Sequence, residues 1–193
     1  MNIIAHRINT LEELAKVKKE DGIEIDLRGN PVTGNIYLQH DHFNSGIDFE
    51  DLLKQYVEDN RTGTIILDVK EERLEYKILE LIKKYNIKNY FFLDCSFPMI
   101  NYLTTHGENN VAIRFSEYEG LDTVRNMAGK ANWVWVDTFT KNPLNIINTE
   151  EIHALGYKIC FVSPELQGQH ELRELYLDTI KSLGVEAICT DEY

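Results

Sequence analysis

The stretch GIEIDL, residues 22–27, is a short apolar run that carries two acids at alternate positions. In a β-strand, residues i and i+2 point to the same side, so Glu24 and Asp26 share one face while Ile23, Ile25 and Leu27 share the other. Two neighbouring carboxylates repel each other where a core is expected, so this strand raises the question of what neutralises them.

Similar short apolar runs recur along the whole chain and alternate with amphipathic helical stretches. This alternation is typical of βα units and a parallel sheet. We expect eight main strands, and one short extra strand at 35–40. The main strands are predicted at 2–6, 22–27, 64–70, 90–94, 111–116, 133–139, 158–163 and 187–191.

The helices between these strands have recognisable starts and ends. NTLEEL indicates a first helix capped by Asn9 or Thr10, and NTEEIHALG a later one capped by Asn148 or Thr149 and ended by Gly156. The other helices are predicted at 48–57, 72–85, 98–105, 122–128 and 170–183.

Eight parallel strands with intervening helices predict a compact (β/α)8 TIM barrel, although such barrels usually need about 250 residues. The chain has 193 residues, and its last predicted strand is followed by almost nothing, so the final helix is expected to be absent. An open doubly wound sheet is the rival fold. No glycine-rich fingerprint follows the first strand, where IAHRINT stands, and this favours the barrel.

Length and charge limit the classes of protein that fit. A chain of 193 residues with 43% hydrophobic content suits a single domain spanning 1–193. The net charge of −12 disfavours nucleic acid and acidic membrane surfaces as partners. Three cysteines within apolar runs suggest reduced thiols, and no signal peptide or transmembrane segment is evident. We therefore expect a cytoplasmic protein.

The residues capable of chemistry fall at or just after strand ends. The carboxyl ends of barrel strands form one face, on which active sites are built, so these residues are expected to gather there. They are His6, Glu24, Asp26, His40, Asp41, Asp68, Lys70, Asp94, Arg114, Asp137, Glu165 and Asp191. Glu24, Asp26 and Asp68 would place three carboxylates around one spot, where a hard divalent cation with oxygen ligands is the simplest neutralising group.

The sequence resembles the glycerophosphodiester phosphodiesterase family, within the phospholipase C-like phosphodiesterases. The resemblance extends over essentially the whole chain. Its motifs are IAHR (residues 4–7), GIEIDL (22–27), IYLQHD (36–41), ILDVK (66–70) and the terminal AICTDEY (187–193). It implies catalytic roles for His6 and His40, metal ligation by Glu24, Asp26 and Asp68, and substrate binding by Arg7 and Lys70.

Three departures from the family pattern are visible. The glycine-rich loop that usually follows the first motif is missing after Arg7, and the third acid is Asp68 where the hydrolases usually have glutamate. The related sphingomyelinase D-like phospholipases resemble this sequence in both respects. Phe161 stands where the family has a tryptophan in the seventh strand. These departures suggest retained chemistry on a different substrate.

The expected activity is metal-dependent hydrolysis of a glycerophosphodiester or similar small phosphodiester, with Mg²⁺ or Ca²⁺ as cofactor and a link to lipid metabolism. His6 and His40 would act as general acid and base, and Lys70 and Arg7 would stabilise the developing charge. Which histidine is the acid is left open by the sequence. A homodimer is one way to cover the open end of the barrel.

Two other functions fit parts of the pattern. A catalytically degenerate barrel would bind a metal and a sugar- or glycerol-phosphate without turnover. A barrel isomerase or aldolase would use Lys70 as a Schiff-base amine, although that chemistry leaves Glu24 and Asp26 unexplained.

Structural interpretations also exist for single residues. Asp68 and Lys70 could form a plain ion pair on one strand face, and Trp133 and Trp135 are expected to pack rather than bind substrate. No chemistry is assigned to His42, His106, His153 or His170.

Overall fold

The computed structural model describes all 193 residues and confirms the predicted fold class, a compact (β/α)8 barrel. The elements alternate along the chain as predicted. In order they are β1 (Asn2–Ala5), α1 (Leu11–Leu14), β2 (Gly22–Gly29), β3 (Ile36–Leu38), α2 (Phe49–Glu58), β4 (Ile65–Val69), α3 (Glu75–Lys84), β5 (Tyr90–Leu93), α4 (Phe97–Thr105), β6 (Ala112–Phe115), α5 (Leu121–Asn126), β7 (Trp133–Val136), α6 (Ile146–Ala154), β8 (Lys158–Val162), η1 (Pro164–Gln167), η2 (His170–Leu172), α7 (Arg173–Leu183) and β9 (Ala187–Thr190).

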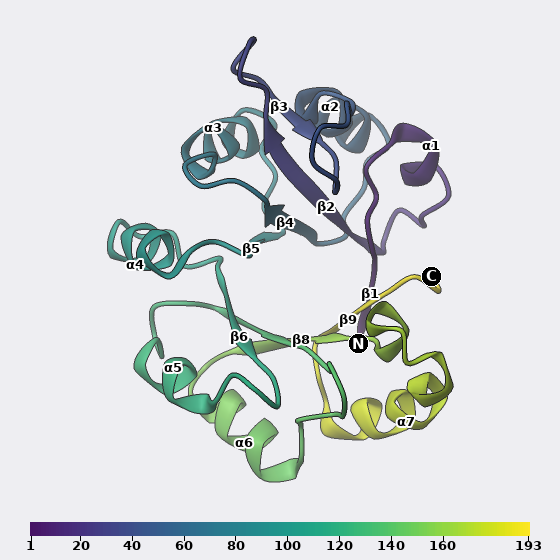
Figure 1. Cartoon of the computed structure of the whole chain (residues 1–193), viewed down its shortest axis with the longest axis vertical. Coiled ribbons are helices and arrows are strands. Elements are labelled where there is room, and N and C mark those ends of the chain that lie inside the picture. The colour runs from purple at the N-terminus through teal and green to yellow at the C-terminus, as the bar shows by residue number, and fades with distance from the viewer. The chain divides into compact units, whose positions relative to one another are not determined.

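The chain divides into two compact units. The first comprises Ala5–Asn101, and the second comprises Met1–Ile4 together with Tyr102–Tyr193. In the first unit β4 lies between β2 and β5 in parallel pairing, and β3 pairs antiparallel with β2. Figure 1 shows α1, α2 and α3 of this unit on the outer side of its strands. In the second unit β6, β7, β8 and β9 pair in parallel in that order.

The core follows from the strand patterns. In β2 the Ile23, Ile25 and Leu27 side chains have no exposed surface, as the alternation predicts, and Glu24 and Asp26 are buried on the opposite face. A strand buried on both faces is typical of a parallel sheet covered by helices. Trp133 and Trp135 are also buried in β7, which agrees with a packing role.

The helix starts were predicted with mixed success. Of the two predicted caps of α1, Asn9 and Thr10, the structure has Thr10, which forms a capping box with Glu13. The predicted cap of α6 at Asn148 or Thr149 was wrong, because Asn145 accepts a hydrogen bond from the Asn148 N–H and starts the helix earlier. The predicted helix at 170–183 begins as the short η2 turn before α7.

None of the helices combines the length and the apolar character that a membrane span requires.

Candidate active site

Three carboxylates meet on β2 and β4 of the first unit. The parallel register pairs Asp26 with Asp68, and Glu24 lies two residues before Asp26 on the same face. One ligand atom from each of Glu24, Asp26 and Asp68 lies within 4.8 Å of the others, and all three residues are buried. The structure therefore brings together the three acids that the sequence predicted to meet.

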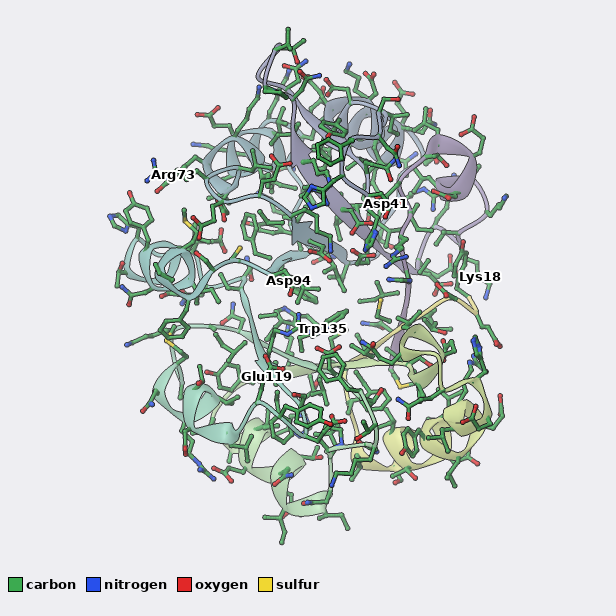
Figure 2. The ribbon with its side chains drawn as sticks, viewed as in Figure 1. Lys18, Asp41, Arg73, Asp94, Glu119 and Trp135 are labelled. Atoms are coloured by element: carbon green, nitrogen blue, oxygen red, sulfur yellow. The ribbon has the colours of Figure 1, made fainter.

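Burial and mutual repulsion disfavour the charged forms of these acids. Burial raises the pKa of Glu24 well above its usual value, and the charges of Asp26 and Asp68 raise it further. Burial, followed by the charge of Asp94, raises the pKa of Asp68 to about 6. Asp94 follows directly after β5, where Figure 2 labels it. The cluster is therefore short of positive charge.

Lys70 supplies one positive charge to the cluster. Its Nζ lies 2.6 Å from Asp68 Oδ2 and 3.1 Å from Asp26 Oδ1. Burial alone would lower the pKa of Lys70, but the carboxylates outweigh it and raise the pKa above its ordinary value. One ammonium against three carboxylates leaves an excess of negative charge.

An unpaired oxygen shows where further positive charge fits. Asp68 Oδ1 is buried and has no hydrogen-bond partner, which is costly for a polar atom in a protein interior. An all-oxygen donor set is what Mg²⁺ and Ca²⁺ prefer. Glu24, Asp26 and Asp68 therefore fit a hard divalent cation, both in donor chemistry and in charge.

His6 and Arg7 enter the site directly after β1. The Nε2 atom of His6 lies 3.9 Å from Glu24 Oε2, and the Arg7 backbone N–H donates to the same oxygen at 2.7 Å. Arg7 has a positive φ of 53°, a conformation that is uncommon outside glycine and often marks functional positions. This turn of the backbone orients the Arg7 N–H toward the carboxylate.

His40 lies in the loop after β3 and has a defined tautomer. Arg7 places a guanidinium nitrogen 2.8 Å from His40 Nε2, and because a guanidinium has no acceptor, Nε2 must accept. His40 Nδ1 then carries the proton and donates to Asp41 Oδ1 at 2.8 Å. This hydrogen bond also lowers the pKa of Asp41. His40 thus joins the other predicted site residues through Arg7.

Two residues of this site were missed by sequence reasoning. Asn9 Nδ2 donates to Asp26 Oδ2 at 2.6 Å, and Asn9 Oδ1 accepts from the Asp26 N–H at 2.9 Å. No sequence pattern indicates this pair, and Asn9 is interpreted there as a helix cap. The second missed residue is Arg28. It lies two residues after Asp26, so the alternation that places Glu24 and Asp26 on one strand face also predicts Arg28 there.

Arg28 holds the loop that carries His40. Its guanidinium is 4% exposed and donates from Nε to the Gln39 carbonyl at 3.0 Å and from a terminal nitrogen to the His40 carbonyl at 2.6 Å. The other terminal nitrogen lies 3.1 Å from His42 Nδ1. His42, to which no chemistry was assigned, is therefore a partner of Arg28.

The Arg28→Met variant is expected to lose both stability and activity. Two part-buried carbonyls lose a charged donor, a hydrogen bond that contributes roughly 1.5–3 kcal/mol in each case, and the loop around His40 loses its support. Chemical denaturation checks the free energy of unfolding. Arg125→Met is a matched control, because Arg125 forms an exposed pair with Glu151 and should change stability by only about 0–1 kcal/mol. Equal effects of the two substitutions would contradict the role given to Arg28.

The predicted residues of the second unit form hydrogen-bonded pairs of their own. Arg114 donates to Asp137, which is buried at the end of β7. Glu165 is buried in η1 and accepts from Ser163 and Thr190. Asp191 directly follows β9. Phe161, which stands in place of the family tryptophan, has no exposed surface.

The remaining histidines, His106, His153 and His170, belong to the second unit. His106 stacks on Tyr102 at the end of α4, and His153 contacts Glu186. His170 begins η2.

Comparisons with known proteins show the fold. No protein-family model matches the sequence, and no curated protein matches it. Several solved structures match over almost the whole chain. The chain has the fold of solved glycerophosphodiester phosphodiesterases.

Three of these structures illustrate the likeness. A glycerophosphodiester phosphodiesterase from Agrobacterium tumefaciens superposes with a TM-score of 0.70 at 16% identity, covering 99% of this chain and 96% of that one. A glycerophosphoryl diester phosphodiesterase from Parabacteroides distasonis has a TM-score of 0.67 at 15% identity, covering 98% and 82%. An Oleispira antarctica phosphodiesterase, solved with the product sn-glycerol-3-phosphate, has a TM-score of 0.73 at 14% identity, covering 99% and 93%.

Proposed function

We propose that the protein is a metal-dependent phosphodiester hydrolase that acts on a glycerophosphodiester or a similar small phosphodiester. The observation that carries the proposal is the buried cluster of Glu24, Asp26 and Asp68, with its unpaired Asp68 oxygen. His6 and Lys70 border this cluster directly. The product bound to the Oleispira antarctica phosphodiesterase supports a glycerol-phosphate moiety in the substrate.

Glu24, Asp26 and Asp68 would hold the cation, either Mg²⁺ or Ca²⁺. When bound, such a cation polarises a phosphate oxygen and neutralises charge in the transition state. Lys70 adds an ammonium beside the phosphate, and its raised pKa keeps it charged at neutral pH. Arg7, whose side chain is exposed, offers a second positive charge to the substrate.

His6 and His40 supply the general acid and the general base. One protonates the leaving alkoxide, and the other takes the proton from the attacking hydroxyl or water. In the tautomer inferred from its contacts with Arg7 and Asp41, His40 Nε2 can accept a proton once the Arg7 guanidinium moves to the phosphate. The family resemblance implies attack by a neighbouring substrate hydroxyl, which displaces the alcohol and forms a cyclic phosphate that water then opens. That route requires a vicinal hydroxyl on the substrate.

An activity panel tests the proposal. We expect the purified protein with Mg²⁺ or Ca²⁺ to hydrolyse at least one of three classes, namely glycerophosphodiesters, lysophospholipids and aryl phosphodiesters. Chelation of the cation should abolish this activity. Absence of hydrolysis across the whole panel with both cations would refute the proposed reaction.

A binding protein without turnover is the second candidate. The contact of Arg7 with His40 Nε2 favours it, because that nitrogen is the atom that must exchange a proton. Calorimetry that detects binding of the cation and of glycerol phosphate, with no hydrolysis of any panel substrate, would select this function. The aldolase alternative is disfavoured, since a Schiff-base lysine needs a lowered pKa and that of Lys70 is raised.

The cation affinity is expected to fall as the pH is lowered through about 6. Burial raises the pKa of Asp68 to about 6, so protons compete with the cation for its oxygens below that value, and the raised pKa of Glu24 adds to this competition. Each pH unit below it should weaken binding about tenfold for each proton displaced. Calorimetric titration with Ca²⁺ at several pH values measures this slope, and an affinity independent of pH would contradict it.

Three broader proposals accompany the function. We propose that residues 1–193 act as a single phosphodiesterase-like domain, that the protein works in the cytoplasm, and that it forms a homodimer. The first two rest on length, composition and cysteine content, and the third stays a prediction. Light scattering on the purified chain tests the third.

A further inference from the structure

Two neighbouring loops of the first unit expose apolar side chains. The 30–35 turn joins β2 to β3 and carries Val32, which is 90% exposed, and the 42–46 loop after β3 carries Phe43, which is fully exposed. Figure 1 shows the turn between β2 and β3 projecting from the strands. We call these two loops the apolar tips. An aromatic ring that is fully exposed to water gains free energy when an apolar surface covers it.

The apolar tips also lack charge. Residues 30–35 read NPVTGN and residues 42–46 read HFNSG, so neither contains an acidic residue, a lysine or an arginine. The chain as a whole has 32 acidic and 20 basic residues and a net charge of −12. An uncharged surface on such a chain avoids the repulsion that the rest of the molecule would meet at an anionic surface.

Phe43 is presented on a fixed loop in an unusual conformation. Its φ is 65°, in the left-handed region that bulky residues rarely adopt, and its ring lies 6.0 Å from that of His42. The loop is held against β3. Gln39 Nε2 donates to the Ser45 carbonyl, and a Cβ at Gly46 would lie 1.8 Å from the Leu38 carbonyl oxygen. Strain that persists on a fixed loop is characteristic of functional positions.

A groove lies between the two apolar tips and beside Arg28. It has a volume of about 540 Å³ and is lined from one tip by Pro31 and from the other by Phe43, with Arg28 also in its wall. Arg28 holds the backbone carbonyls of Gln39 and His40. Both His40 and Phe43 lie in the segment that follows β3.

We propose that the apolar tips dock the protein on the surface of a zwitterionic lipid layer, with the Phe43 ring entering the boundary between headgroups and acyl chains. Two exposed apolar side chains are far too little for a protein interface of about 800 Å² on each partner, whereas aromatic and aliphatic anchors of this size suit shallow insertion. The net charge of −12 disfavours an anionic layer. The substrate class then includes phosphodiesters held in such a layer, and this last point rests on the proposed function.

Vesicle sedimentation tests the docking. The intact protein is mixed with sucrose-loaded phosphatidylcholine vesicles at high lipid concentration, and the bound fraction is measured after centrifugation. The Phe43→Ser variant is expected to lower the partition coefficient about tenfold or more, and Val32→Ser to lower it less. Leu175→Ser is the matched control, because Leu175 is an exposed apolar residue on α7 and should leave binding unchanged. Adding phosphatidylglycerol to the vesicles should reduce binding.

Several outcomes would overturn the inference. They are an unmodified protein that does not sediment with phosphatidylcholine, equal binding by Phe43→Ser, and a decrease of the same size in Leu175→Ser. A dimer in lipid-free solution that Phe43→Ser dissociates, as seen by light scattering, would assign the tips to a second copy instead. Circular dichroism of each variant confirms folding. Because the measurement needs no turnover, its failure and the failure of the hydrolase proposal are separate results.

Discussion

The His6→Ala and His40→Ala variants are each expected to lower kcat for phosphodiester hydrolysis by roughly 10²- to 10⁴-fold. Each substitution removes one of the proposed proton-transfer groups, while the carboxylates proposed to hold the cation stay in place. Divalent-cation affinity, measured by calorimetry, should therefore change little in His40→Ala, since His40 contacts Arg7 and Asp41 rather than the carboxylates. Steady-state kinetics on the best substrate of the panel gives the change in kcat.

The double variant and a control histidine make this test specific. Two groups that act in one reaction are not additive, so the double variant should lose less than the product of the two single losses. His106→Ala is the control, because His106 stacks on Tyr102 and is expected to leave kcat unchanged. If His6→Ala and His40→Ala retain full activity, the proposed acid–base pair is wrong even where hydrolysis itself is found.

The Asp68→Asn variant is expected to lose cation binding and yet to unfold at a higher temperature when metal is absent. The pKa of Asp68 is raised from 3.8 to about 6, which means that the folded protein disfavours the charged carboxylate even with Lys70 beside it. A shift of this size corresponds to a cost of about 3 kcal/mol for keeping Asp68 ionised in the folded protein at neutral pH. Asparagine carries no charge and avoids this cost. Thermal unfolding in the presence of a chelator and calorimetry with Ca²⁺ measure the two effects.

The pH dependence of the metal-free protein's stability is a second measure of the same unfavourable charge on Asp68. Because the folded-state pKa of Asp68 lies above its unfolded value, the relative stability that this group confers is fully present below about pH 3.8 and is lost as the pH rises through about 6. In Asp68→Asn this part of the slope should disappear. Asp178→Asn, an exposed position on α7, is the control. A lower melting temperature in Asp68→Asn with unchanged Ca²⁺ affinity would contradict the arrangement inferred for the cluster.

The sequence predicted the fold and the acids because both depend on strand periodicity. Alternation in GIEIDL places Glu24 and Asp26 on one face, and the run ending in Asp68 and Lys70 adds the neighbouring strand of the sheet. Strand limits shifted by only a few residues, since apolar runs mark strand interiors better than their ends. The parallel order of the strands followed from the alternation with helices.

The parts that escaped prediction depend on contacts between distant residues. Asn9 pairs with the backbone and side chain of Asp26, and local sequence contains nothing that connects these two positions. The α6 start was missed because Asn145 and Asn148 are both good caps, and only the hydrogen bond from the Asn148 N–H to Asn145 decides between them. The Arg7 contact with His40 likewise depends on a left-handed backbone that no motif encodes.

The position of the site within the chain has a consequence for how sequence variation is tolerated. All seven predicted site residues precede residue 71, in the compact unit formed by Ala5–Asn101. Consider a saturation library selected for hydrolysis. Positions where a conservative substitution abolishes activity although the protein is still expressed should concentrate in the first 70 residues. Later positions should fail only where exchange lowers the amount of folded protein, so the two halves of the library would show different kinds of intolerance.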